Sequence, residues 1–217
     1  MAGSMALSAL HVEGPDDKHS LIHLLIRHGI DYDQKPWPAE FPEFKQVGGV
    51  TKLLEGMEDA IKASAGRAIG FVLDAETPLS SRWQAVRDKL EAAGLTVPQD
   101  PPGTGFVAET PKDARVGVWL MPDNQREGSL EDFLRDLVSH EDPLINHAEA
   151  ATDTAKTDFG ASFRPQYRSK AVLHAWLAWQ EEPGKPYGVA MQARYFDHDA
   201  QVAEAFVAWF KRLYRIN

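Results

Sequence analysis

The feature that most constrains the fold is an uninterrupted apolar run that ends on an acid. Residues Ala68 to Leu73 (AIGFVL) carry no polar side chain, and Asp74 follows them directly. A strand without any polar position is typical of parallel sheets, whose strands are buried on both faces. The run therefore predicts a strand inside a layered α/β protein.

Two other segments are largely apolar and also end beside acids. They are Ala6 to Val12 (ALSALHV) and Val116 to Met121 (VGVWLM). Shorter strands are expected at Phe44–Val47 and Phe106–Ala108, and segments with apolar residues at helical spacing separate the strands. This alternation predicts an α/β fold with a mostly parallel, Rossmann-like sheet flanked by helices.

The last third of the chain is mostly helical in pattern, from about Asp142 onward. Ala171 to Trp179 is apolar nearly all round, which predicts a helix buried on most sides, with Trp176 and Trp179 in the core. A final amphipathic helix is expected from Val202 to Leu213. We expect these helices to form a layer packed on the sheet.

The chain has 217 residues, 43% of them hydrophobic, which is enough for one sizeable core. We find no linker that would separate domains. The prediction is a single domain over residues 5–217, with a core at about 6–140 and C-terminal helices at about 141–217. Residues 1–4, before Met5, look like a remnant of cloning and are left out of the argument.

Composition limits the functional classes. There is no cysteine, so disulfides and thiolate zinc sites are excluded and a reducing cytoplasm is expected. No membrane span or signal peptide is expected from the hydropathy pattern. The formal net charge of −9 disfavours a protein that grips nucleic acid mainly through phosphates. It disfavours a metal-dependent nuclease less, because bound cations neutralise acidic residues.

Carboxylates follow three of the predicted strands. They are Glu13, Asp74 with Glu76, and Asp123. In an open α/β sheet ligands bind beyond the carboxyl ends of the strands, so these acids should converge there. Crowded carboxylates repel one another unless a cation lies between them, and hard oxygen ligands suit Mg²⁺ or Mn²⁺. Any one acid alone would be better explained as a helix N-terminal residue, but the coincidence at three strand ends favours a metal site.

Several segments resemble a known family. Val12–Lys18 (VEGPDDK) resembles the opening strand and turn of the Toprim fold, which topoisomerases, primases and the overcoming-lysogenization-defect (OLD) nucleases share. Phe71–Glu76 (FVLDAE) resembles its second motif. Gly117–Asn124, Gly128–Leu134 and Trp176–Gln180 are similar to an uncharacterised bacterial Toprim-related family. The resemblance extends over nearly the whole chain after residue 4.

The resemblance implies a set of Mg²⁺ ligands. In the Toprim fold a Glu after the first strand and an Asp-x-Asp motif bind the metal, which matches Glu13, Asp74 and Glu76. Glu76 replaces the second Asp and is one methylene longer, so it is expected to coordinate differently or through water. Glu131 matches the acid that completes a second metal site in OLD-type relatives, with Asp132 as a rival. As a first-turn acid, Glu131 is equally well explained by the helix dipole.

The resemblance also implies a catalytic lysine. OLD-type relatives have one after the acidic motifs, and Lys170 matches it. Arg164 and Arg168 are close to Lys170 in the sequence and could add positive charge for a phosphate. The alternative is that these residues form the solvated start of a helix.

The expected function is that of a Toprim-type nuclease that uses Mg²⁺ or Mn²⁺ to hydrolyse phosphodiester bonds of DNA or RNA, in anti-phage defence. Glu13, Asp74 and Asp123 would hold the metal, Glu76 and Glu131 would assist, and Lys170 would stabilise phosphate charge. The alternative is a catalytically silent Toprim-like binding or regulatory module that docks on a partner protein. A small-molecule phosphotransfer enzyme is a third option, and self-association is left open.

Overall fold

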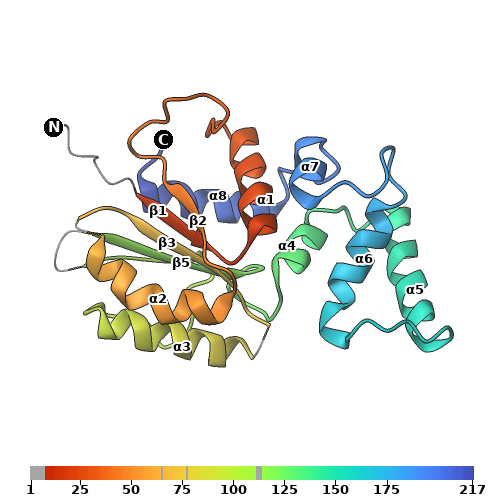
Figure 1. Ribbon diagram of the computed structural model, residues 1–217, viewed down its shortest axis with the longest axis horizontal. Helices are drawn as coiled ribbons and strands as arrows, with labels where there is room; N and C mark the ends of the chain where they lie inside the picture. The colour runs from red at the N-terminus through yellow and green to blue at the C-terminus, as the bar shows by residue number, and fades with distance from the viewer. Residues whose placement is uncertain (1–7, 65, 77, 111–113) are drawn as a thin grey trace.

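The computed structural model describes residues 8–64, 66–76, 78–110 and 114–217. These residues form one five-stranded sheet in the order β2-β1-β3-β5-β4 (Figure 1). Strands β1 (Ala9–Val12), β2 (Glu43–Gln46), β3 (Ile69–Asp74) and β5 (Arg115–Met121) are parallel, and β4 (Phe106–Glu109) is antiparallel at one edge. The predicted α/β fold with a mostly parallel sheet is confirmed, while residues 6 and 7 of the first expected strand lie outside the described part.

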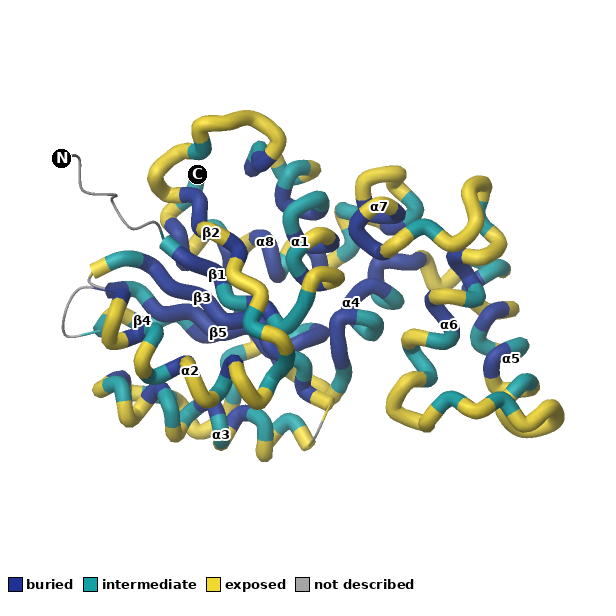
Figure 2. Tube along the Cα trace, in the orientation of Figure 1, coloured by how far each residue is buried: buried dark blue, intermediate teal, exposed yellow. Residues whose placement is uncertain are grey.

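Strand β3 lies between two hydrophobic cores because its side chains alternate between the faces of the sheet. Phe71 and Leu73 belong to the core beneath α2 (Val50–Ala63) and α3 (Leu79–Ala92). Val72 belongs to the core on the other face, beneath α1 (Pro15–Arg27) and α8 (Gln201–Tyr214). Figure 1 shows these helix pairs on opposite sides of the sheet, and Figure 2 shows the central strands buried between them. The apolar run thus has the expected double-sided burial.

Two glycines let α8 lie close against the sheet. A Cβ atom at Gly70 would be 2.6 Å from the Tyr214 hydroxyl, and one at Gly117 would be 2.6 Å from a Leu213 methyl group. The Tyr214 hydroxyl donates a hydrogen bond of 2.7 Å to the Ala9 carbonyl. The end of α8 is therefore fixed across neighbouring strands of the sheet.

The helices between β5 and α8 are arranged differently. Helix α4 (Leu130–Asp136) contacts the sheet, and α7 (Tyr187–Gln192) packs on α1. Helices α5 (Pro143–Thr157) and α6 (Arg168–Leu177) pack on each other and lie to one side of the sheet (Figure 1), with α6 against α4. Not all of the C-terminal helices therefore form a layer on the sheet, and the α5–α6 pair extends away from it.

The prediction that Trp176 and Trp179 are both core residues is right for one of them. Trp176 is buried, but Trp179 is 43% exposed. Helix α6 ends at Leu177, so Trp179 lies in the turn beyond it, where its ring packs against His147 with centroids 5.2 Å apart.

Among the described residues, no helix combines the length and the apolar character needed to span a bilayer.

Candidate functional site

Glu13 and Asp74 meet at the carboxyl ends of two adjacent strands. Glu13 directly follows β1, Asp74 is the last residue of β3, and the two strands pair in parallel. The backbone N–H of Asp74 donates a 2.8 Å hydrogen bond to Glu13 Oε1. The structure therefore brings these two predicted residues together at the edge of the sheet where α/β proteins bind ligands.

Helices α1 and α4 begin beside these two acids. Asp74 Oδ1 accepts a 3.0 Å hydrogen bond from the backbone N–H of Leu130, the first residue of α4. Asp17, in the first turn of α1, accepts a 2.9 Å hydrogen bond from the Gly14 N–H. Both carboxylates thus pair with N–H groups at or before a helix N-terminus, which favours their negative charge.

A pocket of about 250 Å³ opens over this junction. Lys170, Gln166 and Tyr167 form one part of its wall. The acidic residues that line it are Glu13, Asp16, Asp17, Asp74, Glu76 and Glu131. We call this the acidic pocket; it unites five of the six predicted site residues, and only Asp123 does not line it.

Burial and mutual repulsion make these acids reluctant to ionise. Burial, reinforced by the charges of Glu13, Asp17, Glu131 and Glu76, raises the pKa of Asp74 to about 9. Burial followed by the charge of Glu13 raises the pKa of Asp17 to about 7, and burial also raises the pKa of Glu13. Near neutral pH the cluster therefore binds protons unless positive charge is supplied.

Lys170 supplies one positive charge to the pocket. Its Nζ lies 3.0 Å from Glu131 Oε1, and its side chain is 46% exposed. Burial alone would lower the pKa of Lys170, but the hydrogen bond and ion pair with Glu131 raise it. Among the described residues that line the pocket, the acids outnumber this lysine six to one, and the charge of Arg82 acts on Glu13 from outside the lining.

The structure separates the two candidates on α4. Glu131 lines the acidic pocket, where its Oε2 accepts a 3.0 Å hydrogen bond from the Ser129 hydroxyl. Asp132 instead completes the capping box of α4, accepting 2.8 Å from the Ser129 N–H, and accepts 2.6 Å from the Ser169 hydroxyl. Glu131 is therefore positioned for a ligand, whereas Asp132 ties the start of α6 to α4.

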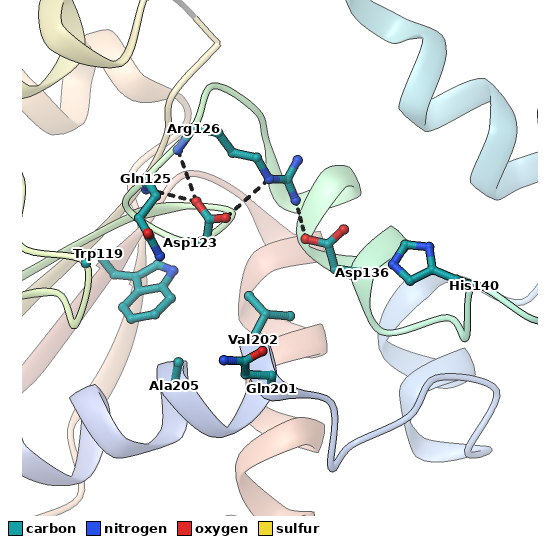
Figure 3. A pocket seen from close by; sticks show the side chains of 10 residues that line it. Trp119, Asp123, Gln125, Arg126, Asp136, His140, Gln201, Val202 and Ala205 are labelled. Carbon is teal, nitrogen blue, oxygen red and sulfur yellow. Dashed lines mark hydrogen bonds and ion pairs between the residues drawn. The ribbon is translucent and has the colours of Figure 1, made fainter.

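Asp123 lies in a second pocket, of about 550 Å³ (Figure 3). Its Oδ1 accepts hydrogen bonds from the N–H groups of Gln125 (2.9 Å) and Arg126 (3.1 Å), and its Oδ2 accepts from Arg126 Nε at 3.2 Å. Arg126 also forms an ion pair with Asp136. Asp123 is thus paired with Arg126 and fixes the turn after β5. The structure does not bring it to Glu13 and Asp74.

The path of the chain after β5 explains this separation. Ala75, which follows β3, forms a β-bridge with Gly128, and this bridge brings the start of α4 beside Asp74. The place expected for Asp123 is therefore taken by Leu130 and Glu131. The turn between β5 and α4 folds back on itself, with Asn124 Oδ1 accepting 2.8 Å from the Leu120 N–H.

Sequence reasoning identified most of the acids but missed part of the wall. Asp16 and Asp17 look like helix-capping residues in the sequence, and Asp17 does cap α1 while also lining the pocket. Gln166 and Tyr167 had no signal beyond their closeness to Lys170 in the chain. Only the fold shows that this segment reaches the carboxyl ends of β1 and β3.

The donor chemistry of the acidic pocket suits a hard divalent cation, which prefers several carboxylate oxygens. In the part of the chain that the structure describes, no group of three or more Asp, Glu or His side chains is already arranged to hold a metal ion. Glu13 and Asp74 accept backbone hydrogen bonds, and Glu131 pairs with Lys170. A cation would therefore have to draw these side chains together and displace Lys170 from Glu131.

The model of one protein family, described as "Protein of unknown function (DUF3226)", matches residues 8–215 of the chain. No curated protein and no solved structure matches the chain. The family match spans the whole sheet and all of the described helices, so the acidic pocket lies inside it.

Proposed function

The chain belongs to the DUF3226 family, and we propose that it is a Toprim-like phosphodiesterase that uses Mg²⁺ or Mn²⁺ to hydrolyse nucleic acid. The observation that carries the proposal is the position of Glu13 and Asp74, adjacent at the ends of β1 and β3 in a pocket lined by four further acids. Such a cluster is costly to ionise without a cation. The order of the two acids along the chain is also the one that the Toprim resemblance implies.

In this proposal Glu13 and Asp74 would hold the cation, and Glu131 would be the third ligand if its ion pair with Lys170 opened. Glu76, which is exposed at the rim, acts through water. A bound divalent ion would polarise a phosphoryl oxygen and lower the pKa of a bound water. Asp123 is left out of the proposed site, because it lines the second pocket and not the acidic pocket.

Lys170 has a role that depends on its exposure at the pocket. Its half-exposed ammonium would be free to neutralise a phosphate oxygen if Glu131 ligated a cation instead of pairing with Lys170. Asp17 lies behind the first acids and is nearly fully buried, at 7% exposed. It adds negative charge that favours cation binding over an empty, protonated pocket.

A binding or regulatory module is the second candidate. It is favoured by the ion pair between Lys170 and Glu131 and by the absence, among the described residues, of a carboxylate group already arranged for a metal. In that case Lys170 would balance the pocket permanently, and a partner protein would dock without any hydrolysis.

The test compares two conservative variants that lie in different pockets. Purified protein should cleave plasmid DNA, single-stranded DNA or RNA with Mg²⁺ or Mn²⁺ and not in EDTA. Asp74→Asn should reduce the rate by about 100-fold or more, because the metal supplies several kcal/mol of transition-state stabilisation. Asp123→Asn, the matched control, should keep the activity. Equal loss in both variants, or cleavage that survives Asp74→Asn, would remove the acidic pocket as the active site.

A further inference from the structure

One residue of the acidic pocket is an exposed aromatic ring. Tyr167 lines the pocket, yet it is 44% exposed. It is the last residue of a short 3-10 helix, η1 (Pro165–Tyr167), that leads directly into α6 and Lys170. Among the described residues that line this pocket, it is the one aromatic side chain. The proposed mechanism of hydrolysis gives it no task.

The backbone that carries Tyr167 is tied down on both sides. Its own N–H donates a 2.8 Å hydrogen bond to the Arg164 carbonyl. The next residue, Arg168, forms a bidentate ion pair with Asp153 on α5, with distances of 2.6 and 2.7 Å. Ser169 donates to Asp132 on α4. The ring is thus presented from an anchored segment, which lowers the entropy cost of binding a flat ligand group.

The size of the acidic pocket decides which part of a nucleotide can enter it. Its volume of about 250 Å³ lies below the usual range for pockets that enclose a whole small molecule, roughly 300–1,000 Å³. Its lining is acidic and polar, which suits a cation, water and one phosphate group. A base and its sugar must then remain outside, at the rim where Tyr167 is exposed.

The charge of the protein makes a neutral contact with the substrate important. With a formal net charge of −9, the chain offers little of the phosphate neutralisation on which most nucleic-acid binding depends. Stacking of a base on an aromatic ring is independent of phosphate charge and is worth roughly 5- to 150-fold in affinity per base.

We propose that Tyr167 stacks on the base next to the phosphate in the acidic pocket, and that the substrate is therefore an unpaired strand. The proposal rests on the proposed function only in assuming that the pocket takes a phosphodiester. Inside a duplex both faces of each base are covered by neighbouring pairs, so stacking on Tyr167 away from a duplex end would require extrusion of the nucleotide. An unpaired nucleotide offers a free face without that cost.

Binding can be measured without turnover. The probes are fluorescein-labelled oligothymidylate and oligouridylate of about eight nucleotides, and a blunt DNA duplex of the same length. Anisotropy titrations in Ca²⁺, which prefers the same oxygen ligands, would use the full-length protein and three variants. Tyr167→Ala removes the ring, Tyr167→Phe keeps it, and Phe159→Ala removes a ring that is 83% exposed outside the pocket, before η1.

The expected result is a loss of single-strand affinity of about 5- to 150-fold in Tyr167→Ala. Tyr167→Phe and Phe159→Ala should bind like the unchanged protein, and the duplex should bind more weakly than either single strand. A Tyr167→Ala variant with unchanged affinity, an equal loss in Phe159→Ala, tighter binding of the duplex, or no binding of any probe would overturn the proposal. The DNA and RNA probes together show which backbone is preferred.

The two proposals fail separately. Binding that depends on Tyr167, without any Mg²⁺-dependent cleavage, would leave the stacking role intact and remove the hydrolytic function. Cleavage that Asp74→Asn abolishes, with an unchanged KM for single strands in Tyr167→Ala, would do the reverse. A rise in KM with little change in kcat would identify Tyr167 as a binding residue that acts in the ground state as well as the transition state.

Discussion

The acidic pocket and the second pocket both contain carboxylates, but they differ in how far those carboxylates are paired with positive charge. In the acidic pocket six acids face one lysine, and burial and repulsion raise the pKa of Asp74 to about 9. In the second pocket Arg126 lies between Asp123 and Asp136 and forms an ion pair with each (Figure 3). The second pocket is the larger of the two, yet both of its carboxylates are already paired with the same arginine. An acid after a strand is therefore a poor guide to a metal site unless the counter-charge around it is known.

The largest predicted effect concerns helix α6. This helix forms part of the wall of the acidic pocket and no part of the wall of the second pocket. Helix α6 carries Lys170, and its Trp176 is buried against Phe196, with ring centroids 5.4 Å apart. Trp176→Ala should cost about 3–5 kcal/mol of unfolding free energy, as large-to-small core substitutions do. Chemical denaturation should measure this loss as one cooperative transition.

Trp179→Ala is the matched control for that substitution. Trp179 lies just beyond α6 and is 43% exposed, so its removal should cost less than about 1 kcal/mol. A similar cost for both variants, or two separate unfolding transitions, would show that the α5–α6 pair is not held to the sheet through Trp176. The wall formed by Lys170 and Tyr167 would then be mobile relative to Glu13 and Asp74.

The second prediction measures the metal directly. Mn²⁺ binding, followed by electron paramagnetic resonance, should weaken by about 100-fold in Glu13→Gln, because an acid that bonds to the Asp74 N–H becomes neutral. Asp136→Asn, in the second pocket, should leave the affinity unchanged. Loss of binding in Asp136→Asn alone would place the metal in the second pocket and reverse the comparison.

The sequence predicted part of the difference between the two pockets, and the wrong prediction for Asp123 has a physical cause. The apolar run ending at Asp74 indicated a parallel strand, and the direct pairing of β1 with β3 places Glu13 beside Asp74. Asp123 looked equivalent because it also follows a buried strand. The position of the Asp123 side chain depends on the turn after β5 and on its ion pair with Arg126. Tertiary contacts determine both, and the spacing of apolar residues in the sequence does not predict such contacts.

The C-terminal third shows the same limit. Its helices were predictable from apolar spacing, but their placement was not, because an apolar helix can be buried by any neighbour. Trp176 and Trp179 have equally apolar surroundings in the sequence, and only the end of α6 at Leu177 separates them. Tyr167 became part of the acidic pocket because α6 packs on α4, which again is a contact between distant segments.

The third prediction uses pH. Since the pKa of folded Asp74, about 9, lies above its ordinary value, protonation of Asp74 stabilises the fold. The stabilisation by protonated Asp74 is complete at a pH below the ordinary pKa of an aspartate, and it is lost as the pH rises toward 9. Without metal, the melting temperature should therefore fall between pH 5 and pH 9, in the range where Asp17, with a pKa of about 7, also ionises.

Asp74→Asn should flatten that decline and raise the melting temperature at pH 8 in EDTA by several degrees, because about 1 kcal/mol corresponds to about 2–4 °C in a chain of this size. Addition of Mg²⁺ should stabilise the unchanged protein and have little effect on the variant. Asp123→Asn should keep the full pH dependence. A decline of equal size in Asp74→Asn would mean that other groups dominate the titration.

The smallest predicted effect tests whether counter-charge alone separates the two pockets. Arg126→Gln removes the cation between Asp123 and Asp136, two ion pairs that are partly exposed, so it should cost less than about 1 kcal/mol. Burial raises the pKa of Asp136 and Arg126 opposes that rise, so the pKa of Asp136 should rise further in the variant.

Melting temperatures should be compared in the Asp74→Asn background, where the acidic pocket responds little to Mg²⁺. In that background Mg²⁺ should raise the melting temperature of the Arg126→Gln variant by about 1–2 °C, which is within the shift that about 1 kcal/mol produces. It should not raise the melting temperature of the Asp74→Asn variant that keeps Arg126. An equal response of both would show that two neighbouring acids without a counter-charge do not suffice, and that the acidic pocket depends on its deeper burial.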